Sequence, residues 1–179
     1  MQLKDLNQHP NDQAIRFDEG PHIYYIDGQA YKTSVTKFIH SYFPQFNADK
    51  IIDKMMTSAK WKDSPYYGQT KDQIKKSWTN KGSKASSDGT TLHKQIENYY
   101  NQLQIGNPEM IEYQYFLQFH QDHIEKKLIP FRTEWEVYDR DIELAGSIDM
   151  IYKNNQDGTY VIYDWKRCSN FKEENSFES

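Results

Sequence analysis

The chain has 179 residues, of which 36% are hydrophobic and 15% aromatic, and its formal net charge is −4. This length predicts one domain that can bury a hydrophobic core. No apolar run approaches the roughly 20 residues of a membrane helix, and residues 1–5 contain no apolar signal-peptide core. Since Cys168 is the single cysteine, the chain forms no internal disulfide and no four-cysteine metal site. We therefore expect a globular, intracellular protein that is neither secreted nor bound to a membrane.

The charge is distributed unevenly along the chain. Between positions 71 and 84, one acid, Asp72, stands against five lysines. A negative net charge argues mildly against a nucleic-acid partner, because phosphate contacts usually need a basic surface. A carboxylate metal site would also add negative charge that bound cations neutralise, so the net charge is a weak objection.

The N-terminal two-thirds of the chain predicts a β-hairpin followed by helices. Residues 1–14 are polar, and we expect them to fray. Strand-like segments surround the Asp27-Gly28 turn at residues 16–17, 22–26 and 30–32. Apolar spacing, capping residues and prolines predict helices over about residues 34–41, 48–60, 71–78, 84–103 and 108–128, with a turn at 80–83.

From Phe131 onward the pattern changes to strands. Residues 131–138, 142–152 and 159–166 are strand-like, and the segments between them are rich in turn-forming residues. The whole is a mostly helical N-terminal part followed by a β-meander, with no internal repeat and no domain linker. We therefore expect one α/β (α+β) domain over residues 1–179.

Two acidic residues stand out in the strand region. Asp149 and Asp164 fall on strands that form a hairpin around Asp157-Gly158, so we expect their carboxylates to lie side by side. Neighbouring carboxylates repel each other unless a cation lies between them. Sites rich in oxygen ligands suit Mg²⁺ or Mn²⁺, which makes these two residues candidate metal ligands.

The surroundings of these carboxylates support the same interpretation. Lys166 projects from the same strand face as Asp164, where an ammonium group can orient water or stabilise charge on a phosphate. Gly146 and Ser147 are small enough for the backbone of a ligand to approach closely. An Asp-x-Lys pair alone is common on solvated strands, but the apolar run 161–163 predicts a buried strand, and buried charge requires pairing or a metal.

A second group of candidates lies partly on a predicted helix. His93 and Glu97 are four positions apart and therefore share one helix face, which presents an imidazole and a carboxylate together. The alternative is an ordinary His–Glu pair on a helix surface. Glu134 and Glu136, on the first strand of the meander, are further acidic candidates.

In chain order, these residues form Gly-Thr-x-x-His-x-x-x-Glu at 89–97, Gly-x-x-Asp at 146–149 and Asp-Trp-Lys at 164–166. This set resembles the RecB-like branch of the PD-(D/E)XK nuclease superfamily, including the mitochondrial genome maintenance exonuclease group and related viral or phage nucleases. The three motifs in this order form a fairly specific signal. The resemblance implies a restriction-endonuclease-like core, a mixed β-sheet flanked by helices, over residues 84–179, preceded by a hairpin and helices over residues 1–83.

The resemblance also implies an activity and a role for each matching residue. The implied metal ligands are Asp149, Asp164, His93 and the backbone carbonyl of Trp165. Lys166 would position the attacking water, and Glu97 would support His93. The implied reaction is Mg²⁺- or Mn²⁺-dependent hydrolysis of DNA, by an exonuclease acting on ends or single strands or, nearly as well, by an endonuclease. Such an enzyme would serve DNA repair or recombination in the cytoplasm, the nucleus or a viral replication site.

The chain departs from this family after Lys166. Family members usually continue into a helix with a Gln-x-x-x-Tyr pattern, which residues 169–179 do not contain. We therefore expect a catalytic core truncated at its C-terminus. The alternative function is a nucleic-acid-binding or scaffolding domain that kept the fold and lost catalysis. No Gly-x-x-x-x-Gly-Lys loop is present, so a helicase partner would be a separate chain or a missing domain.

The lysine-rich segment is a candidate for nucleic-acid binding. Lysines can follow phosphates while the bases of a single strand stack on aromatic rings. The candidate residues are Lys71, Lys75, Lys76, Lys81, Lys84, Trp78 and Tyr100. The alternative is that Trp78 and Ile74 belong to the core and that the lysines only solvate a helix.

Overall fold

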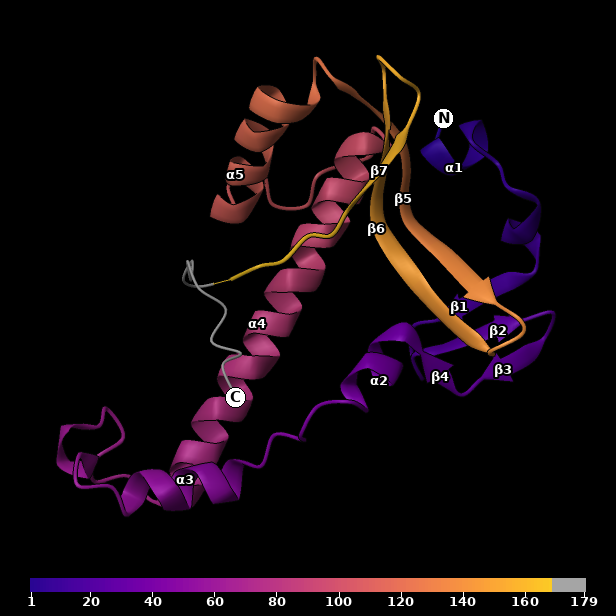
Figure 1. Cartoon of the computed structure of the whole chain (residues 1–179). Helices are drawn as coiled ribbons and strands as arrows, with labels where there is room; N and C mark the ends of the chain where they lie inside the picture. Colours follow the sequence, from indigo (N-terminus) through magenta and orange to yellow (C-terminus); the bar gives the residue numbers. More distant parts are fainter. Residues whose placement is uncertain (169–179) are drawn as a thin grey trace.

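The computed structural model describes residues 1–168 and combines helices with a mixed β-sheet (Figure 1). The helices are α1 (Leu3–Leu6), α2 (Val35–His40), α3 (Ala48–Met56), α4 (Lys71–Tyr100) and α5 (Ile111–Phe119). Shorter turns of helix are η1 (Pro10–Gln13), η2 (Trp61–Asp63) and the π-helical η3 (His120–Ile124). The strands are β1 (Ile15–Asp18), β2 (Ile23–Ile26), β3 (Gln29–Tyr31), β4 (Thr33–Ser34), β5 (Leu128–Asp139), β6 (Leu144–Asn154) and β7 (Tyr160–Tyr163). The expected α/β class, a mixed sheet flanked by helices, is confirmed.

β6 is the central strand of the larger sheet, whereas β1, β2 and β3 form a separate antiparallel sheet. Along one edge, β6 pairs antiparallel with β5 over most of its length. Along the other edge, it pairs parallel with β4 at residues 144–145 and antiparallel with β7 at residues 150–153. Within the described chain, residues 146–149 of β6 have no strand partner on this second edge. The expected C-terminal helix pattern concerns residues 169–179, which lie outside the described residues.

α4 is one continuous helix of 30 residues, whereas the sequence predicted two helices and a turn at 80–83. A capping box formed by Thr70 and Gln73 begins it. An interior glycine such as Gly82 costs only about 1 kcal/mol relative to alanine, and no proline interrupts the helix. Packing at both ends outweighs that cost, because Ile74 is buried where α4 meets α3 and Ile96 is buried in the main core.

No helix among residues 1–168 is long and apolar enough to cross a membrane.

Residues 1–14 pack against the rest of the chain, so the prediction of a frayed terminus was wrong. Leu3 is buried, and its N–H donates to Asn101 Oδ1 over 2.8 Å. The Arg132 guanidinium of β5 donates to both carboxylate oxygens of Asp12, at 2.8 and 3.3 Å. The segment is held because the backbone of α1 bonds to Asn101, directly after α4, and the Asp12 side chain bonds to the buried Arg132 of β5.

Two predicted boundaries near the C-terminus also differ from the structure. α5 begins at Ile111 and changes at His120 into the π-helical turn, so it is shorter than the predicted helix over 108–128. β7 is a four-residue edge strand on which Ile162 is 66% exposed. The prediction of a buried strand leading into Asp164 was therefore wrong, since an edge strand turns alternate side chains to solvent whatever their polarity.

α2 packs against β6 at Gly146. A Cβ atom at Gly146 would lie only 3.0 Å from Cγ2 of Val35 and 3.3 Å from its Cβ. The sequence suggested that the small Gly146 would let a ligand approach closely. In the structure, Gly146 instead makes room for α2. This contact places the beginning of α2 beside the strand that carries Asp149.

We expect Asp12→Ala to lower the free energy of unfolding by about 2–3 kcal/mol, because it leaves the buried Arg132 guanidinium without its carboxylate. Burial pushes the pKa of Asp12 upward, but hydrogen bonds from Arg132 and other groups lower it overall. The stabilisation is therefore complete above the unfolded-state pKa of about 3.9 and is lost as the pH falls through the lower folded-state value. Denaturant unfolding of the wild type and of Asp12→Ala at neutral and acidic pH measures this difference. Equal free energies of unfolding for the two proteins at neutral pH would contradict the expectation.

We expect Gly146→Ala to lower the free energy of unfolding by about 1 kcal/mol, because Val35 has to move away from the new methyl group. In a Val35→Ala background the contact is absent, and the same change becomes neutral or stabilises by up to ~0.5 kcal/mol, since alanine restricts the unfolded chain. Thermal unfolding of the four proteins measures this double-mutant cycle. The same effect of Gly146→Ala in both backgrounds would show that α2 does not depend on this glycine.

Candidate metal centre

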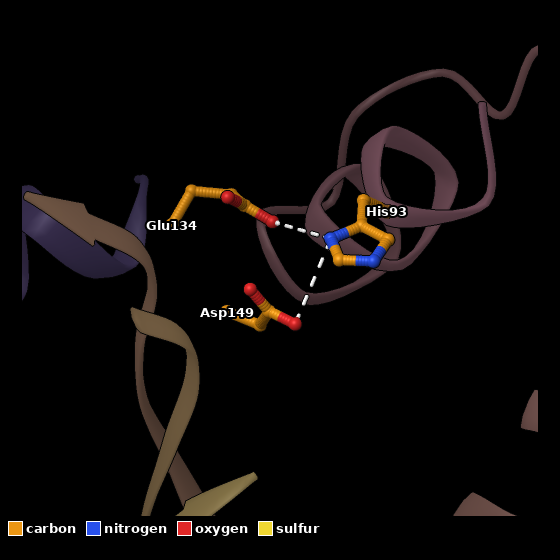
Figure 2. Close-up of side chains that lie close together, drawn as sticks. All are labelled: His93, Glu134 and Asp149. Carbon is orange, nitrogen blue, oxygen red and sulfur yellow. Dashed lines mark ion pairs between the residues drawn. The ribbon is translucent and has the colours of Figure 1, made fainter. Parts of the chain in front are cut away.

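Three side chains from separate elements meet beside residues 146–149 of β6, which among the described residues have a strand partner on only one edge. His93 comes from α4, Glu134 from β5 and Asp149 from β6 (Figure 2). His93 Nδ1 lies 3.4 Å from Glu134 Oε1 and 3.7 Å from Asp149 Oδ2. One ligand atom from each residue lies within 4.8 Å of the others, so this three-residue centre could hold a metal ion.

The register of β5 and β6 brings the two carboxylates together. Thr133 pairs with Met150 and Trp135 with Ile148, so Glu134 and Asp149 lie between two consecutive pairs as neighbours across the two strands. Glu134 has a φ of 44°, a left-handed conformation that costs a non-glycine residue on the order of 1–3 kcal/mol. Strain of this kind inside a strand is typical of positions whose orientation serves a function, which supports a role for Glu134.

The backbone of Trp165 connects to two members of the centre. Its N–H donates to Asp149 Oδ2 over 2.7 Å, and its carbonyl oxygen lies 2.9 Å from His93 Nε2. A carbonyl oxygen can only accept, so Nε2 must carry a proton. In neutral His93, the lone pair of Nδ1 then faces two carboxylates, an arrangement of acceptors that needs a proton or a metal ion between them.

The pKa shifts in the centre follow from this crowding of acceptors. Burial raises the pKa of Asp149, and repulsion from Glu134 and Asp164 acts in the same direction. Hydrogen bonding to Glu134 is the main cause that raises the pKa of His93, against the effect of burial. The centre therefore favours positive charge between its members, from a protonated ring or from a bound cation.

The donor set fits a divalent cation. Carboxylates suit Mg²⁺, Mn²⁺ and Ca²⁺, while imidazole suits several transition metals, so an Asp, a Glu and a His do not select one ion. Metal-binding histidines usually donate their second ring N–H to a carbonyl or carboxylate, as His93 does to Trp165. The expected metal-ligand role of the Trp165 carbonyl is thus replaced in this arrangement by the orientation of His93.

Asp164 and Lys166 lie at the margin of the centre. Repulsion from Asp164 adds to the raised pKa of Asp149, but Asp164 is not among the residues whose ligand atoms converge, so its role as a metal ligand stays a prediction. Both residues follow β7 and are largely exposed, and Lys166 Nζ lies 2.8 and 2.9 Å from the two Asp164 oxygens. Lys166 therefore pairs with Asp164 and is not directed into the three-residue centre.

The other acidic candidates are separated by the structure. Glu97 forms an ion pair with Lys94 at 2.7 Å and does not join the centre, although it shares α4 with His93. Glu136 also stays outside the centre, and burial raises its pKa. Of the two glutamates on β5, only Glu134 reaches His93.

An ion-pair cluster that the sequence did not reveal holds the segment after Lys166. Arg167 Nε donates to Glu112 Oε1 over 2.6 Å, and Arg167 Nη2 lies 3.2 Å from Asp88 Oδ2. These contacts join the segment to α5 and α4 only two residues beyond Trp165. Arg167 thereby helps to position the backbone that orients His93 and Asp149.

The predicted nucleic-acid-binding residues are only partly available. Lys71 Nζ lies 2.8 Å from both Asp53 oxygens, and Lys75 Nζ lies 3.0 Å from both Asp49 oxygens, so these lysines are paired with α3. Lys84 forms an ion pair with Asp88. Lys76 and Lys81 are exposed, and Lys81 lies over the Tyr66 ring.

The two aromatic candidates also differ from each other. Tyr100 is buried, and its hydroxyl contacts Tyr152 at 2.6 Å and His120 at 2.9 Å, so the prediction that it binds nucleic acid was wrong. Its position on the inward face of α4 explains this, because it packs in the main core. Trp78 is half-buried and packs edge-on to Tyr66.

One side of the centre opens into a cavity of about 960 Å³ between α4, β5 and the N-terminal segment. The charged side chains that line it are Asp5, Asp12, Glu19, Glu97, Glu134, Glu136, Lys4, Lys94 and Arg132. Acids outnumber bases here, so this side attracts cations and repels a phosphate backbone.

Of the metal ligands suggested by the sequence, the structure brings together His93, Asp149 and the backbone of Trp165, leaves Asp164 outside the three-residue centre, and adds Glu134. The sequence offered Glu134 only as one of two glutamates on a predicted strand. Comparisons of the chain with protein-family models, with curated proteins and with solved structures found no match.

We expect the His93 ring of the metal-free protein to titrate above its ordinary pKa of about 6.5, because Glu134 and Asp149 stabilise the imidazolium. Its contribution to stability is then complete below about 6.5 and is lost as the pH rises through the folded-state value. NMR titration of the ring measures this, and Glu134→Gln should lower the pKa. A ring that titrates at or below the ordinary value would contradict the described contacts.

Proposed function

We propose that this chain is a divalent-metal-dependent nuclease that hydrolyses phosphodiester bonds of DNA. The observation that carries the proposal is the convergence of His93, Glu134 and Asp149 from three elements, with Nδ1 of His93 directed at both carboxylates. His93 and Asp149 belong to the motifs that resemble the PD-(D/E)XK nucleases. A bound Mg²⁺ or Mn²⁺ ion would supply an activated water and stabilise the charge that develops on the phosphate.

The residues of the chain would divide this work. His93, Glu134 and Asp149 would hold the ion, and the Trp165 backbone would keep the first and third of these in orientation. Lys166 is 76% exposed at its side chain and bound only to Asp164 among the described residues, so its ammonium group can turn towards a phosphate. We propose DNA ends or single strands as the substrate, as in the exonuclease group that the motifs resemble.

A nucleic-acid-binding domain without catalysis is the second candidate function. It is favoured by one observation, the exposed ion pair between Asp164 and Lys166, in which each residue has the other as its partner. Metal binding alone does not separate the two candidates, because a centre can keep its ion after the catalytic lysine has lost its role. Cleavage of DNA separates them.

The first test is metal binding, measured by isothermal titration calorimetry with Mg²⁺ and by electron paramagnetic resonance with Mn²⁺. We expect one site that Glu134→Gln and Asp149→Asn each weaken by about 10-fold or more, since each removes a charged ligand. Affinity should rise as the pH passes the pKa of His93, because the ring must be neutral to bind an ion. Glu136→Gln is the matched control, because Glu136 lies on the same strand outside the centre. No metal binding by the folded wild type would refute the proposal.

The second test is cleavage of end-labelled single- and double-stranded DNA with Mg²⁺, Mn²⁺ or EDTA. We expect metal-dependent cleavage that falls by roughly 100-fold or more in Asp149→Asn and in Lys166→Ala, and that Glu136→Gln retains. The product ladder distinguishes removal of terminal nucleotides from internal cleavage. A wild type that binds metal and DNA without cleaving would support the second candidate function.

A further inference from the structure

Charge is strongly segregated between two parts of the molecule. Residues 32–84, which we call the arm, contain 11 lysines and four acids, a net charge of +7; the rest of the chain therefore carries −11 within the total of −4. The arm comprises α2, α3 and the first half of α4, and Figure 1 shows α3 and this half of α4 extending away from the larger sheet. A polyanion would therefore meet a favourable surface on the arm and a repulsive one elsewhere.

The arm also exposes aromatic rings. Phe38 on α2 is 44% exposed, Tyr42 and Phe46 in the α2–α3 connection are each 72% exposed, and Tyr67 is 54% exposed. Exposed rings concentrated in one segment are typical of interaction sites. Phe38 and Tyr42 pack edge-on to each other, and Phe46 lies beside Trp78, yet these rings keep much of their surface exposed to a planar partner.

The lysines that accompany these rings are free to bind phosphates. Lys37, Lys50 and Lys54 are exposed, and none of them forms an ion pair with any of residues 1–168. Lys71 and Lys75, by contrast, are occupied by the acids of α3. Available positive charge therefore lies on α2 and α3 as well as at Lys76 and Lys81 of α4.

We propose that the arm binds a single strand of nucleic acid, with bases stacked on Phe38, Tyr42 and Phe46 and phosphates bound by Lys37, Lys50 and Lys54. The inference rests on the proposed function for the class of substrate. Stacking requires unpaired bases, because the faces of paired bases are already covered within a duplex. A net charge of +7 beside the rings favours a polyanion over an apolar peptide.

The arm is placed to deliver a strand to the metal centre. α2 begins at Val35, which packs on Gly146, three residues before Asp149 on β6. α4 joins the arm to the centre directly, since Lys75 and His93 are 18 positions apart on one helix, or about 27 Å. The cavity beside the centre is acidic, so the arm offers the more favourable surface for phosphates.

The test is binding of fluorescent oligonucleotides of about 16 nucleotides, as single-stranded DNA, single-stranded RNA and duplex DNA, in EDTA so that nothing is cleaved. We expect single strands to bind better than the duplex, and Tyr42→Ala and Phe46→Ala each to weaken this binding by about 5-fold or more. Lys50→Gln and Lys54→Gln should each reduce the slope of log affinity against log salt by about 0.7. The comparison of DNA with RNA identifies the natural strand.

Matched controls lie on the other part of the molecule. Tyr115→Ala on α5 removes a ring that is 67% exposed, and Lys126→Gln removes an exposed lysine; both should leave binding unchanged. Photocrosslinking of the wild type to iodouracil-containing strands should label residues 38–67 and does not depend on any variant. Equal binding of duplex, equal effects of the control variants, or crosslinks confined to other parts of the chain would overturn the proposal.

This test is independent of catalysis. Strand binding in EDTA by a protein that never cleaves would support the arm and refute only the nuclease. Metal-dependent cleavage that persists in Tyr42→Ala and Phe46→Ala, together with unchanged strand binding, would refute the arm and leave the nuclease standing.

Discussion

The backbone of Trp165 is the connection on which the candidate site depends. Its N–H donates a hydrogen bond to the carboxylate of Asp149, and its carbonyl oxygen accepts one from Nε2 of His93. Because a carbonyl can only accept, this contact determines which ring nitrogen carries a proton and leaves Nδ1 facing Glu134 and Asp149. The same contacts draw the chain away from the β6 ladder directly after β7, beside residues 146–149, which within residues 1–168 are paired on only one edge. Arg167 then joins the departing segment to α4 and α5.

The continuity of α4 connects this site to the rest of the molecule. Its C-terminal half is anchored in the aromatic core, where it carries His93, and its N-terminal half is anchored to α3 by Ile74 and two lysine–aspartate pairs. One helix therefore joins a negatively charged region that favours cations to a positively charged region that favours phosphates. A nuclease needs both, because the ion has to be held by carboxylates while the substrate has to be attracted despite them.

The local geometry also explains why several polar residues are ordered. Asp12 and Asn101 occupy positions where buried donors on β5 and α1 require acceptors. Glu134 has a left-handed backbone within a strand, a conformation that the surrounding pairs of β5 and β6 must stabilise. Gly146 is small because α2 crosses β6 there, so the glycine of the Gly-x-x-Asp motif serves packing next to the aspartate that serves the centre.

The sequence by itself determined the α/β class, most of the helices and strands, and the candidacy of His93 and Asp149, because periodicity, turn residues and motif spacing are local properties. The sequence did not decide between Glu134 and Glu136. That choice depends on the register in which β5 pairs with β6, and a slip of a single residue gives a different register. The composition of the turn does not specify it. The sequence did not predict the exposure of β7, because this follows from its position at a sheet edge. Nor did it predict the ion pairs of Lys71 and Lys75, because their partners lie on α3. Only the tertiary structure decided these features, because each is a contact between residues that are distant in the chain.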